Sequence, residues 1–292
     1  MKGISGETKN LGVIGWPIVH SLSPAMQAAA IRAAGIDYAY IAMPVHPEAL
    51  TQAVAGLRSL GFRGFNVTIP HKMAIIECLD EIDEDARRIG AVNTVVIEDG
   101  RLSGHNTDVT GFLRGLSRQG MTVRGKRAAL FGAGGAARAV IWGLAKEGAE
   151  RITVGVRDEM KARAALADLA SVVNLEVFSW EDTAFRDALK NAALLVNSTP
   201  LGMTPKLEAI PPVDWNLVQP SAFVYDIIYT PARTRFLQEA EARGHRVLNG
   251  TSMLVGQGAE ALALWTGIQP DEAAMERALL DALAGKREAD RA

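Results

Sequence analysis

The chain has 292 residues, its hydrophobic and charged fractions are 48% and 22%, and its formal net charge is −2. These values are typical of a globular protein, and the chain contains neither a basic stripe for nucleic acid nor an apolar run of about 18 residues that could span a membrane. Cys78 is the only cysteine and the five histidines are scattered, which excludes an internal disulfide and predicts no metal site. We therefore expect a cytoplasmic protein.

Strand-like and helix-like patterns alternate along almost the whole chain, which is typical of an α/β fold with a mostly parallel sheet. In the first 110 residues we expect strands at Leu11–Gly15, Tyr38–Met43 and Gly64–Thr68, and helices at Ser23–Ala34 and Pro47–Leu60. Ser23 followed by Pro24 is typical of an N-cap and a proline at the first helical position. The pair Asp99-Gly100, between strands Val92–Glu98 and Leu102–Gly104, indicates a β-hairpin.

A second block of alternating elements follows a boundary that we expect near Val109–Arg124. The expected strands are Lys126–Phe131, Arg151–Val156, Leu194–Asn197 and Phe223–Ile227, and the expected helices are Asp108–Gln119, one that ends at Glu147, Thr251–Thr266 and Asp271–Ala284. The proline- and glycine-rich segment Pro200–Pro220 is expected to be a long loop. Periodicity alone leaves open which block the final helices join.

Residues 130–137 read Leu-Phe-Gly-Ala-Gly-Gly-Ala-Ala and match the pattern G-x-G-x-x-A between a strand and a helix. Gly132 permits the tight turn, Gly134 lets the backbone approach a pyrophosphate, and Ala137 allows close helix–strand packing. The helix N-terminus offers N–H groups and a positive dipole to phosphates. This context favours dinucleotide binding over a simple glycine-rich turn and predicts a Rossmann-like domain at residues 111–249.

The strand that ends at Val156 is followed by Arg157 and Asp158, where cofactor choice is usually made. An acidic residue there favours the ribose hydroxyl of NAD, and an arginine favours the 2′-phosphate of NADP. Arg157 with Lys161 argues for NADP, whereas Asp158 argues for NAD or for both. If Asp158 caps the following helix, NADP is favoured, and NADP is the cofactor that we predict.

Three polar motifs precede residue 110 and lie at strand ends or in the loops that follow. They are His20–Pro24, Asn66–Lys72, and Asn93-Thr94 with Asn106–Asp108. In open α/β sheets, ligands bind outside the carboxyl ends of strands. The hydroxyls, carboxamides, ammonium and carboxylate of these motifs suit a ligand rich in hydroxyl groups. Taken singly, Lys72 could be a solvated lysine and Asp108 a helix cap.

These motifs make the sequence resemble the shikimate dehydrogenase family, including its quinate/shikimate branch. The resemblance runs from about Leu11 to Thr266 and rests on VIGWPIVHSLSP, FNVTIPHK, GAVNT, GHNTD, GAGGAAR, VNSTPLGM, YDIIY and MLVGQGAEALALW. It implies a substrate-binding domain at residues 1–110, completed by C-terminal helices within 250–292, and an NADP domain. It also implies NADPH-dependent reduction of 3-dehydroshikimate to shikimate in chorismate and aromatic amino-acid biosynthesis, with the protein as a monomer or homodimer.

The resemblance also implies roles for single residues. Lys72 and Asp108 match the family's catalytic pair, and both also belong to the substrate site. The other substrate-binding residues that it implies are Ser21 and Ser23 with Tyr229 for the carboxylate, and Asn66, Thr68, Asn93 and Gln257 for ring hydroxyls. The cofactor-binding residues that we expect are Gly132, Ala133, Gly134, Gly135, Ala136, Arg157, Asp158, Lys161 and Gly250.

Two positions depart from the family pattern. The usual signature after the second strand of the NADP domain reads Asn-Arg-Thr-x-x-Arg, whereas this chain has Val156-Arg157-Asp158-Glu159-Met160-Lys161. That run looks more like the quinate/shikimate branch, which is reported to accept either cofactor. His105 stands where a small or acidic residue is common in the family, and the sequence offers no role for it.

Reduction of a ketone leaves an alkoxide that must receive a proton. The Lys72 ammonium can polarise the carbonyl and donate that proton, and a neighbouring carboxylate keeps the lysine charged. The pair therefore favours reduction over oxidation. The alternatives are a dual quinate/shikimate dehydrogenase that uses NAD, a non-catalytic sensor of cofactor and shikimate-like acids, and another Rossmann oxidoreductase such as a tetrahydrofolate dehydrogenase.

Overall fold

The computed structural model describes the backbone of residues 4–289 and side chains through residue 285. The chain divides into two compact units. The first unit comprises the residues up to Thr107 together with those from Val255 on, and the second unit is Asp108–Leu254. Each unit contains one six-stranded sheet. Among residues 4–289, no helix is long and apolar enough to cross a membrane.

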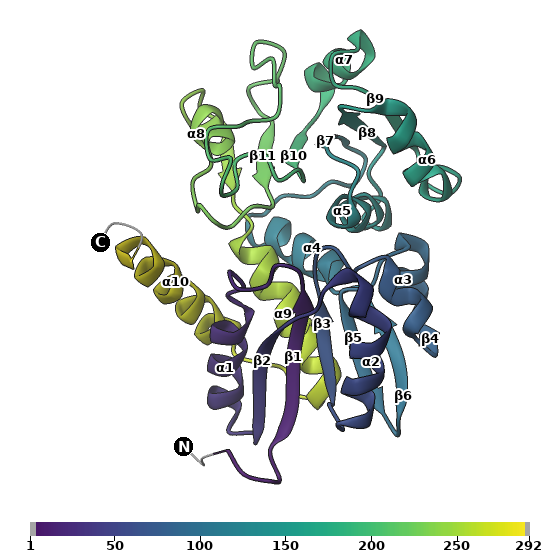
Figure 1. The fold of residues 1–292 in the computed structure, drawn as a ribbon. Coiled ribbons are helices and arrows are strands. Elements are labelled where there is room, and N and C mark those ends of the chain that lie inside the picture. Colours follow the sequence, from purple (N-terminus) through teal and green to yellow (C-terminus); the bar gives the residue numbers. More distant parts are fainter. Residues whose placement is uncertain (1–3, 290–292) are drawn as a thin grey trace. The chain divides into compact units, whose positions relative to one another are not determined.

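The sheet of the first unit has the strand order β2-β1-β3-β5-β6-β4 (Figure 1). Its strands are β1 (Lys9–Gly15), β2 (Tyr38–Pro44), β3 (Gly64–Val67), β4 (Glu81–Ile82), β5 (Thr94–Glu98) and β6 (Arg101–His105). β1 is parallel to β2 and β3, and β4 is parallel to β6. β5 is antiparallel to both of its neighbours. The expected mostly parallel sheet is thus confirmed.

The hairpin expected at Asp99-Gly100 is also confirmed. Glu98 pairs with Arg101, which leaves two residues in the turn. Asp99 and Gly100 have positive φ angles of 48° and 75°, as a type I′ turn requires at both central positions.

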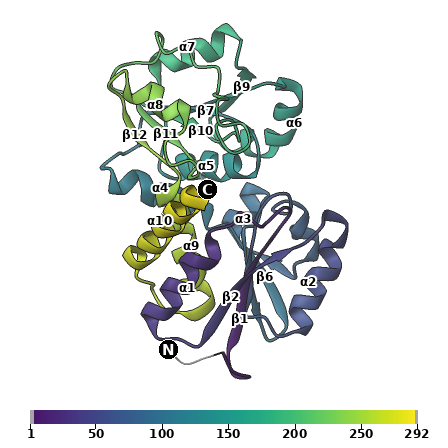
Figure 2. The same ribbon diagram turned by 60° about the vertical axis from the view of Figure 1, so that its left-hand side comes forward.

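Helices cover both faces of this sheet. They are α1 (Ser23–Ala34), α2 (Leu50–Ser59), α3 (Glu84–Ile89), α9 (Thr251–Thr266) and α10 (Glu272–Ala289), with short 3₁₀ helices η1 (Pro47–Ala49) and η2 (Ala74–Cys78). α2 packs on one face through Leu50, Val54 and Leu57, and α1, α9 and α10 lie on the other side (Figure 2). α9 is fixed to the sheet by Trp265, whose indole Nε1 donates to the carbonyl oxygen of Val95 at 2.9 Å.

The expected N-cap of α1 is wrong by one residue. Leu22 is the N-cap and makes no side-chain capping bond, and Ser23 is the first helical residue. The N–H of Ser23 donates to the Ser21 Oγ at 3.3 Å, so the hydroxyl that accepts a backbone N–H at this helix start is that of Ser21.

The sheet of the second unit is entirely parallel and has the order β12-β11-β10-β7-β8-β9. Its strands are β7 (Arg127–Phe131), β8 (Arg151–Val156), β9 (Leu175–Ser179), β10 (Leu194–Asn197), β11 (Phe223–Asp226) and β12 (Arg246–Leu248). Successive strands run outward from β7 to β9, and the chain then returns to β10 on the other side of β7. This is the doubly wound order in which dinucleotides bind at the point of reversal, here between β7 and β10.

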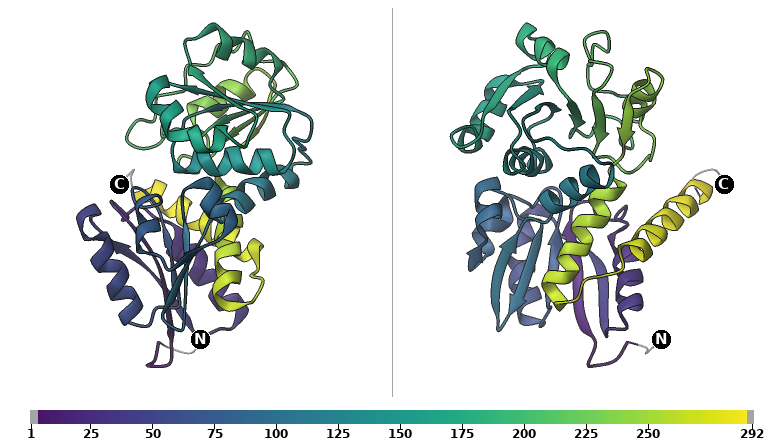
Figure 3. Two further views of the ribbon diagram at one scale, coloured as in Figure 1. Left: turned by 90° about the vertical axis from the view of Figure 1, so that its right-hand side faces the viewer. Right: turned by 180° about the vertical axis from the view of Figure 1, so that it is seen from behind.

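Helices pack on both faces of the second sheet (Figure 3). They are α4 (Asp108–Arg118), α5 (Gly135–Lys146), α6 (Glu159–Ala170), α7 (Thr183–Asn191) and α8 (Arg235–Glu241). One core cluster contains apolar residues of α4, α5 and α6, and a second cluster contains those of α7 and α8. Arg138 of α5 is buried and is paired with Asp168 of α6.

Candidate active site and cofactor-binding loop

The polar motifs of the first unit gather at one edge of its sheet. β1, β3 and β6 end at this edge, and the antiparallel β5 begins there. In the register of the sheet, Asn66 of β3 lies opposite Thr94 of β5, and Thr94 lies opposite His105 of β6. The loops after β1 and β3 are joined by a bond of 3.0 Å from the backbone N–H of Trp16 to the carbonyl of Ile69. The edge therefore brings together segments that are far apart in the sequence.

Two buried asparagines organise this edge. Asn66 and Asn93 are 6% and 2% exposed. The Asn66 Nδ2 donates to the carbonyl of Asn93 at 3.1 Å and to Thr94 Oγ1 at 3.0 Å. The Asn93 Oδ1 accepts from the Thr107 N–H at 2.8 Å, and the Asn93 Nδ2 donates to Thr107 Oγ1 at 3.0 Å. These bonds hold both carboxamides in fixed orientations.

Ser21, Ser23, Thr68 and Lys72 are all partly exposed at the same edge. The Ser21 Oγ accepts from the Ser23 N–H at 3.3 Å. The backbone carbonyl of Lys72 accepts from the Val92 N–H at 2.7 Å, which fixes the lysine backbone beside the Asn93 segment. The edge thus presents two hydroxyls near the start of α1 and an ammonium after β3.

Asp108 is buried, at 5% exposure, and is the first residue of α4. A carboxylate in the first turn of a helix is stabilised by the positive end of the helix dipole. Asp108 directly follows Thr107, which the Asn93 carboxamide holds.

His105 has a structural partner that the sequence did not reveal. Its Nδ1 lies 2.8 Å from the Asp83 Oδ2, and Asp83 also accepts from the Ala86 N–H as the N-cap of α3. Burial alone would raise the pKa of the Asp83 carboxyl, but the hydrogen bonds and charge of His105 and the N-cap bond outweigh it and lower that pKa. His105 therefore links the end of β6 to α3.

The glycine-rich loop lies at the reversal point of the second sheet. Gly132 has a φ of +106°, and a Cβ there would lie 2.8 Å from the Ser198 Oγ after β10. Gly134, by contrast, is exposed, and a Cβ there would meet nothing within 4 Å. As the N-cap of α5, Gly134 makes no side-chain capping bond. Packing within the protein thus explains Gly132 but not Gly134, whose missing side chain leaves the helix N-terminus open to a phosphate. Ala133, Gly135 and Ala136 are partly exposed in the same loop.

The cofactor-choice residues follow β8, and Arg157, Asp158 and Lys161 are all exposed. The Asp158 side chain accepts a hydrogen bond of 3.0 Å from the Lys161 N–H and is the N-cap of α6. β8 itself ends on the apolar Val156. The carboxylate of Asp158 is therefore engaged by its own helix, which is the arrangement that the sequence analysis associated with NADP.

Gly250, Tyr229 and Gln257 are the remaining sequence-predicted residues. A Cβ at Gly250 would lie 2.0 Å from the carbonyl oxygen of Ile227, so tight backbone packing explains this glycine. Tyr229 is partly exposed, and burial raises the pKa of its phenol. Gln257 is buried on α9.

Asp226 is a buried carboxyl that the sequence analysis did not single out. It is 0% exposed at the end of β11 and accepts from Asn197 Nδ2, the Ile228 N–H and Thr234 Oγ1. Burial raises its pKa from 3.8 to about 6, although these three hydrogen bonds oppose the shift. Asp226 therefore ties the end of β10 to the loop that carries Tyr229. The motifs VNSTPLGM and YDIIY contain Asn197 and Asp226, but a strand-end aspartate gives no sequence signal of its burial.

A family model described as the shikimate dehydrogenase substrate binding domain matches residues 13–95. A second one, described as the shikimate 5′-dehydrogenase C-terminal domain, matches residues 250–280. The NADP-dependent shikimate dehydrogenase of Moorella thermoacetica is 45% identical over 283 residues, which are 96% of this chain and 95% of that protein. The chain belongs to the shikimate dehydrogenase family.

Solved structures of the family share the fold over almost the whole chain. A shikimate dehydrogenase in complex with NADP+ is 39% identical and has a TM-score of 0.90, with 96% of this chain and 98% of that one covered. The quinate dehydrogenase of Corynebacterium glutamicum, in complex with NAD, is 31% identical and has a TM-score of 0.84, with 94% and 99% covered. By identity, this member of the family is nearer to the shikimate dehydrogenases than to that quinate dehydrogenase.

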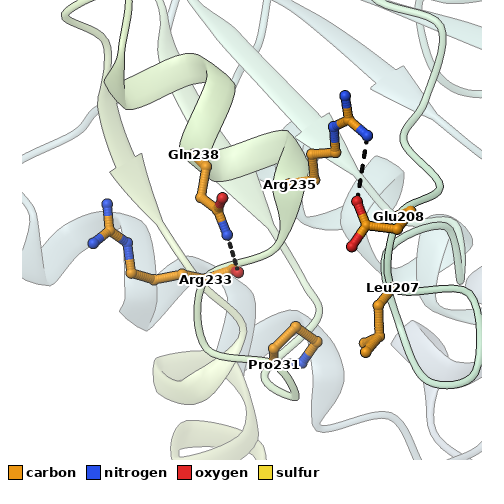
Figure 4. A pocket seen from close by; sticks show the side chains of 6 residues that line it. All are labelled: Leu207, Glu208, Pro231, Arg233, Arg235 and Gln238. Atoms are coloured by element: carbon orange, nitrogen blue, oxygen red, sulfur yellow. Dashed lines mark hydrogen bonds and ion pairs between the residues drawn. The ribbon is translucent and has the colours of Figure 1, made fainter.

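A cavity of about 310 Å³ in the second unit contains none of the site residues that the family motifs predict (Figure 4). It is lined by Leu207, Glu208, Pro231, Arg233, Arg235 and Gln238. Arg235 is paired with Glu208 at 3.3 Å, and Arg233 is paired with Glu241. Its cationic side chains are thus already matched by carboxylates of the same unit, and we assign it no part in the reaction.

Proposed function

We propose that the protein is an NADP-dependent shikimate dehydrogenase that reduces 3-dehydroshikimate to shikimate, a step of chorismate and aromatic amino-acid biosynthesis. One observation carries this proposal. The hydroxyl, carboxamide and ammonium groups of three separate motifs lie at one sheet edge, where Asn66 and Asn93 are held by a buried network. Such an edge suits a polyhydroxylated ring and is a poor site for an apolar ligand.

Lys72 and Asp108 carry the proton chemistry in this proposal. Bound NADPH supplies the hydride to the ketone carbon. The Lys72 ammonium polarises the ketone oxygen and gives it the proton that completes the hydroxyl group. The Asp108 carboxylate can accept a hydrogen bond from a ring hydroxyl and so orient the ring. A charged lysine at the outset favours reduction.

The other site residues recognise the two kinds of polar group on the substrate. Ser21 and Ser23, with Tyr229, hold the carboxylate, and Asn66, Thr68, Asn93 and Gln257 hold ring hydroxyls. Both N–H groups of Asn66 are already used, by the Asn93 carbonyl and by Thr94. The Asn66 Oδ1 accepts from the Tyr40 hydroxyl at 2.7 Å and has a second lone pair, to which a ring hydroxyl can donate.

Three features of the second unit fit NADP. Gly134 leaves space at the N-terminus of α5 for the pyrophosphate. Arg157 supplies an exposed guanidinium for the 2′-phosphate. Asp158 accepts from the Lys161 N–H as the N-cap of α6, so its carboxylate is directed at its own helix. Ala133, Gly135, Ala136, Lys161 and Gly250 complete the proposed cofactor site.

The alternative is a dual quinate/shikimate dehydrogenase that uses NAD. Initial rates with the four pairs of shikimate or quinate and NADP+ or NAD+ separate the two. We expect the highest kcat/KM for shikimate with NADP+, and the highest value for quinate with NAD+ would overturn the proposal. A preparation that binds NADPH without turning over 3-dehydroshikimate would instead indicate a sensor. We also propose that the protein acts in the cytoplasm, as a monomer or homodimer.

A further inference from the structure

His71 belongs to the polar motif Asn66–Lys72, but the proposed function gives it no role. It is 1% exposed, and its ring Nε2 lies 2.8 Å from the carbonyl oxygen of Val45. Because a carbonyl can only accept, the Nε2 carries a proton and donates it in this bond. The buried imidazole therefore joins the loop after β3 to the residue that follows β2.

Val45, at the other end of this bond, is firmly held. It is 7% exposed and belongs to the same apolar cluster as Leu50 and Val54 of α2. Its backbone N–H donates to the carbonyl of Gly15, at the end of β1, at 3.1 Å. The His71 ring therefore donates to the carbonyl of a residue that close packing and a backbone bond keep in place.

His71 directly precedes Lys72 in the chain. The N–H of His71 donates to the carbonyl of Thr68 at 2.9 Å, and the carbonyl of Lys72 accepts from the Val92 N–H at 2.7 Å. The backbone is therefore held on both sides of the Lys72 Cα, by His71 before it and by Val92 after it. A lysine side chain is a flexible four-carbon stem, so the place of its ammonium depends on how firmly its Cα is held.

We propose that His71 is a positioning residue for the Lys72 ammonium, and that its bond to Val45 sets where this general acid stands relative to the ketone oxygen. This rests on the proposed function. His71 itself is too deeply buried to touch the substrate. Without the imidazole N–H, the buried Val45 carbonyl loses this donor, and the loop that carries Lys72 loses one of its attachments. A displacement of about 1 Å in a catalytic group can cost about 100-fold in rate.

The test measures the reduction of 3-dehydroshikimate by NADPH in His71→Leu and His71→Gln, each built with Lys72 and in a Lys72→Ala background. Leucine has no donor, whereas the glutamine Nε2 can replace the imidazole N–H. With Lys72, His71→Leu should lower kcat by about 10- to 100-fold, and His71→Gln should recover most of that loss. In the Lys72→Ala background, His71→Leu should cause no further loss, because the group that it misplaces is already absent. The KM for NADPH should stay unchanged in every variant.

His245→Leu is the matched control, because His245 is a second buried histidine bonded to a carbonyl, in the other unit. It is 6% exposed, and its Nδ1 lies 3.2 Å from the carbonyl oxygen of Ala222. The control should leave kcat unchanged, and Tm reports whether each variant folds. If His71→Leu does not fold, His71→Met takes its place, since methionine also lacks a donor and adapts to irregular space.

Four results would overturn the role of His71. They are an unchanged kcat in His71→Leu, no recovery in His71→Gln, an equal loss of kcat in His245→Leu, and the same loss from His71→Leu in the Lys72→Ala background as with Lys72. Any of them in a protein whose wild type reduces 3-dehydroshikimate rejects this role alone. A wild-type protein that does not reduce 3-dehydroshikimate rejects the proposed function.

Discussion

At the scale of single residues, Arg157 and Asp158 are neighbours in the sequence but have different roles. Asp158 accepts from the Lys161 N–H, which engages it in capping α6, and Arg157 is exposed. A guanidinium that binds a phosphate contributes about 1.5–3 kcal/mol, which is roughly 10- to 100-fold in affinity. The preference for NADP should therefore depend on Arg157 and not on Asp158.

Arg157→Ala should lower kcat/KM for NADPH by about 10-fold or more and leave that for NADH nearly unchanged, because only NADPH carries the 2′-phosphate. Asp158→Thr is the control, since threonine can also cap a helix. Asp158→Thr should leave the ratio of kcat/KM for NADPH to kcat/KM for NADH unchanged. Initial-rate kinetics with both cofactors measure this, and a large change of preference in Asp158→Thr would show that the carboxylate faces the ribose.

Asp226 should make the stability of the fold depend on pH. Its pKa is raised to about 6 in the folded chain from an ordinary value of 3.8. The folded chain therefore binds this proton more tightly than the unfolded chain, and this group lowers the free energy of unfolding as pH rises through that interval. Asparagine at this position keeps one acceptor for Ile228 and Asn197, and its amide N–H can donate to Thr234.

Asp226→Asn should accordingly gain stability relative to wild type by roughly 1 kcal/mol between pH 5 and pH 7.5. Urea unfolding of both proteins at the two pH values gives this difference, and the subtraction removes the contributions of all other carboxyls. Parallel pH dependences in variant and wild type would mean that Asp226 does not have the raised pKa.

At the scale of elements, α9 is held against the first sheet by a close approach at Gly64. A Cβ there would lie 2.2 Å from the Trp265 Nε1 and 2.4 Å from the carbonyl oxygen of Val95. These two atoms are hydrogen-bonded to each other, so neither can move without loss of that bond. The glycine therefore sets how close the helix that carries Gln257 lies to the strands.

Gly64→Ala should lower the free energy of unfolding by about 2–3 kcal/mol, as overpacking of a rigid contact does. Gly56→Ala is the matched control in the helix α2, because a Cβ there meets nothing within 4 Å. It should raise stability by about 0.5–1 kcal/mol, since alanine is the better helix former. Chemical denaturation measures both, and a Gly64→Ala protein as stable as wild type would show that α9 does not need this approach.

Most elements were predictable because their signals are local. The hairpin at Asp99-Gly100 needs two positive φ angles, and the sequence supplies the residues that adopt them. Residues 157–193 contain α6, β9 and α7. The sequence analysis considered a helix after Asp158 without giving its bounds, and it left β9 and α7 unassigned although Asp182 caps α7. β4 has two residues, which are too few to show the alternation of apolar and polar residues that indicates a strand. The N-cap at Ser23 was wrong, because the helix begins one residue earlier and Leu22 is its N-cap.

At the scale of the whole molecule, the candidate site was predictable where motif residues sit at strand ends. Loops after parallel strands meet at one edge, so Asn66 and Lys72 could be grouped from the sequence. Asn93 joins them for another reason, because the antiparallel β5 begins at the same edge. The bond from the Tyr40 hydroxyl to the Asn66 Oδ1 and the burial of Asp226 could not be found in this way, because only the folded chain brings the partners near. An aromatic in a strand and an aspartate at its end look like ordinary core and turn residues.

The most direct measurement is the oxidation of NADPH by wild type and Lys72→Ala when 3-dehydroshikimate is added. The wild-type protein should oxidise NADPH when 3-dehydroshikimate is added. The variant should lose at least about 100-fold in kcat, with a smaller change in KM, because it lacks the general acid. Absence of turnover in the wild type, or a near-normal kcat in Lys72→Ala, would contradict the assignment of the reaction and of its proton donor.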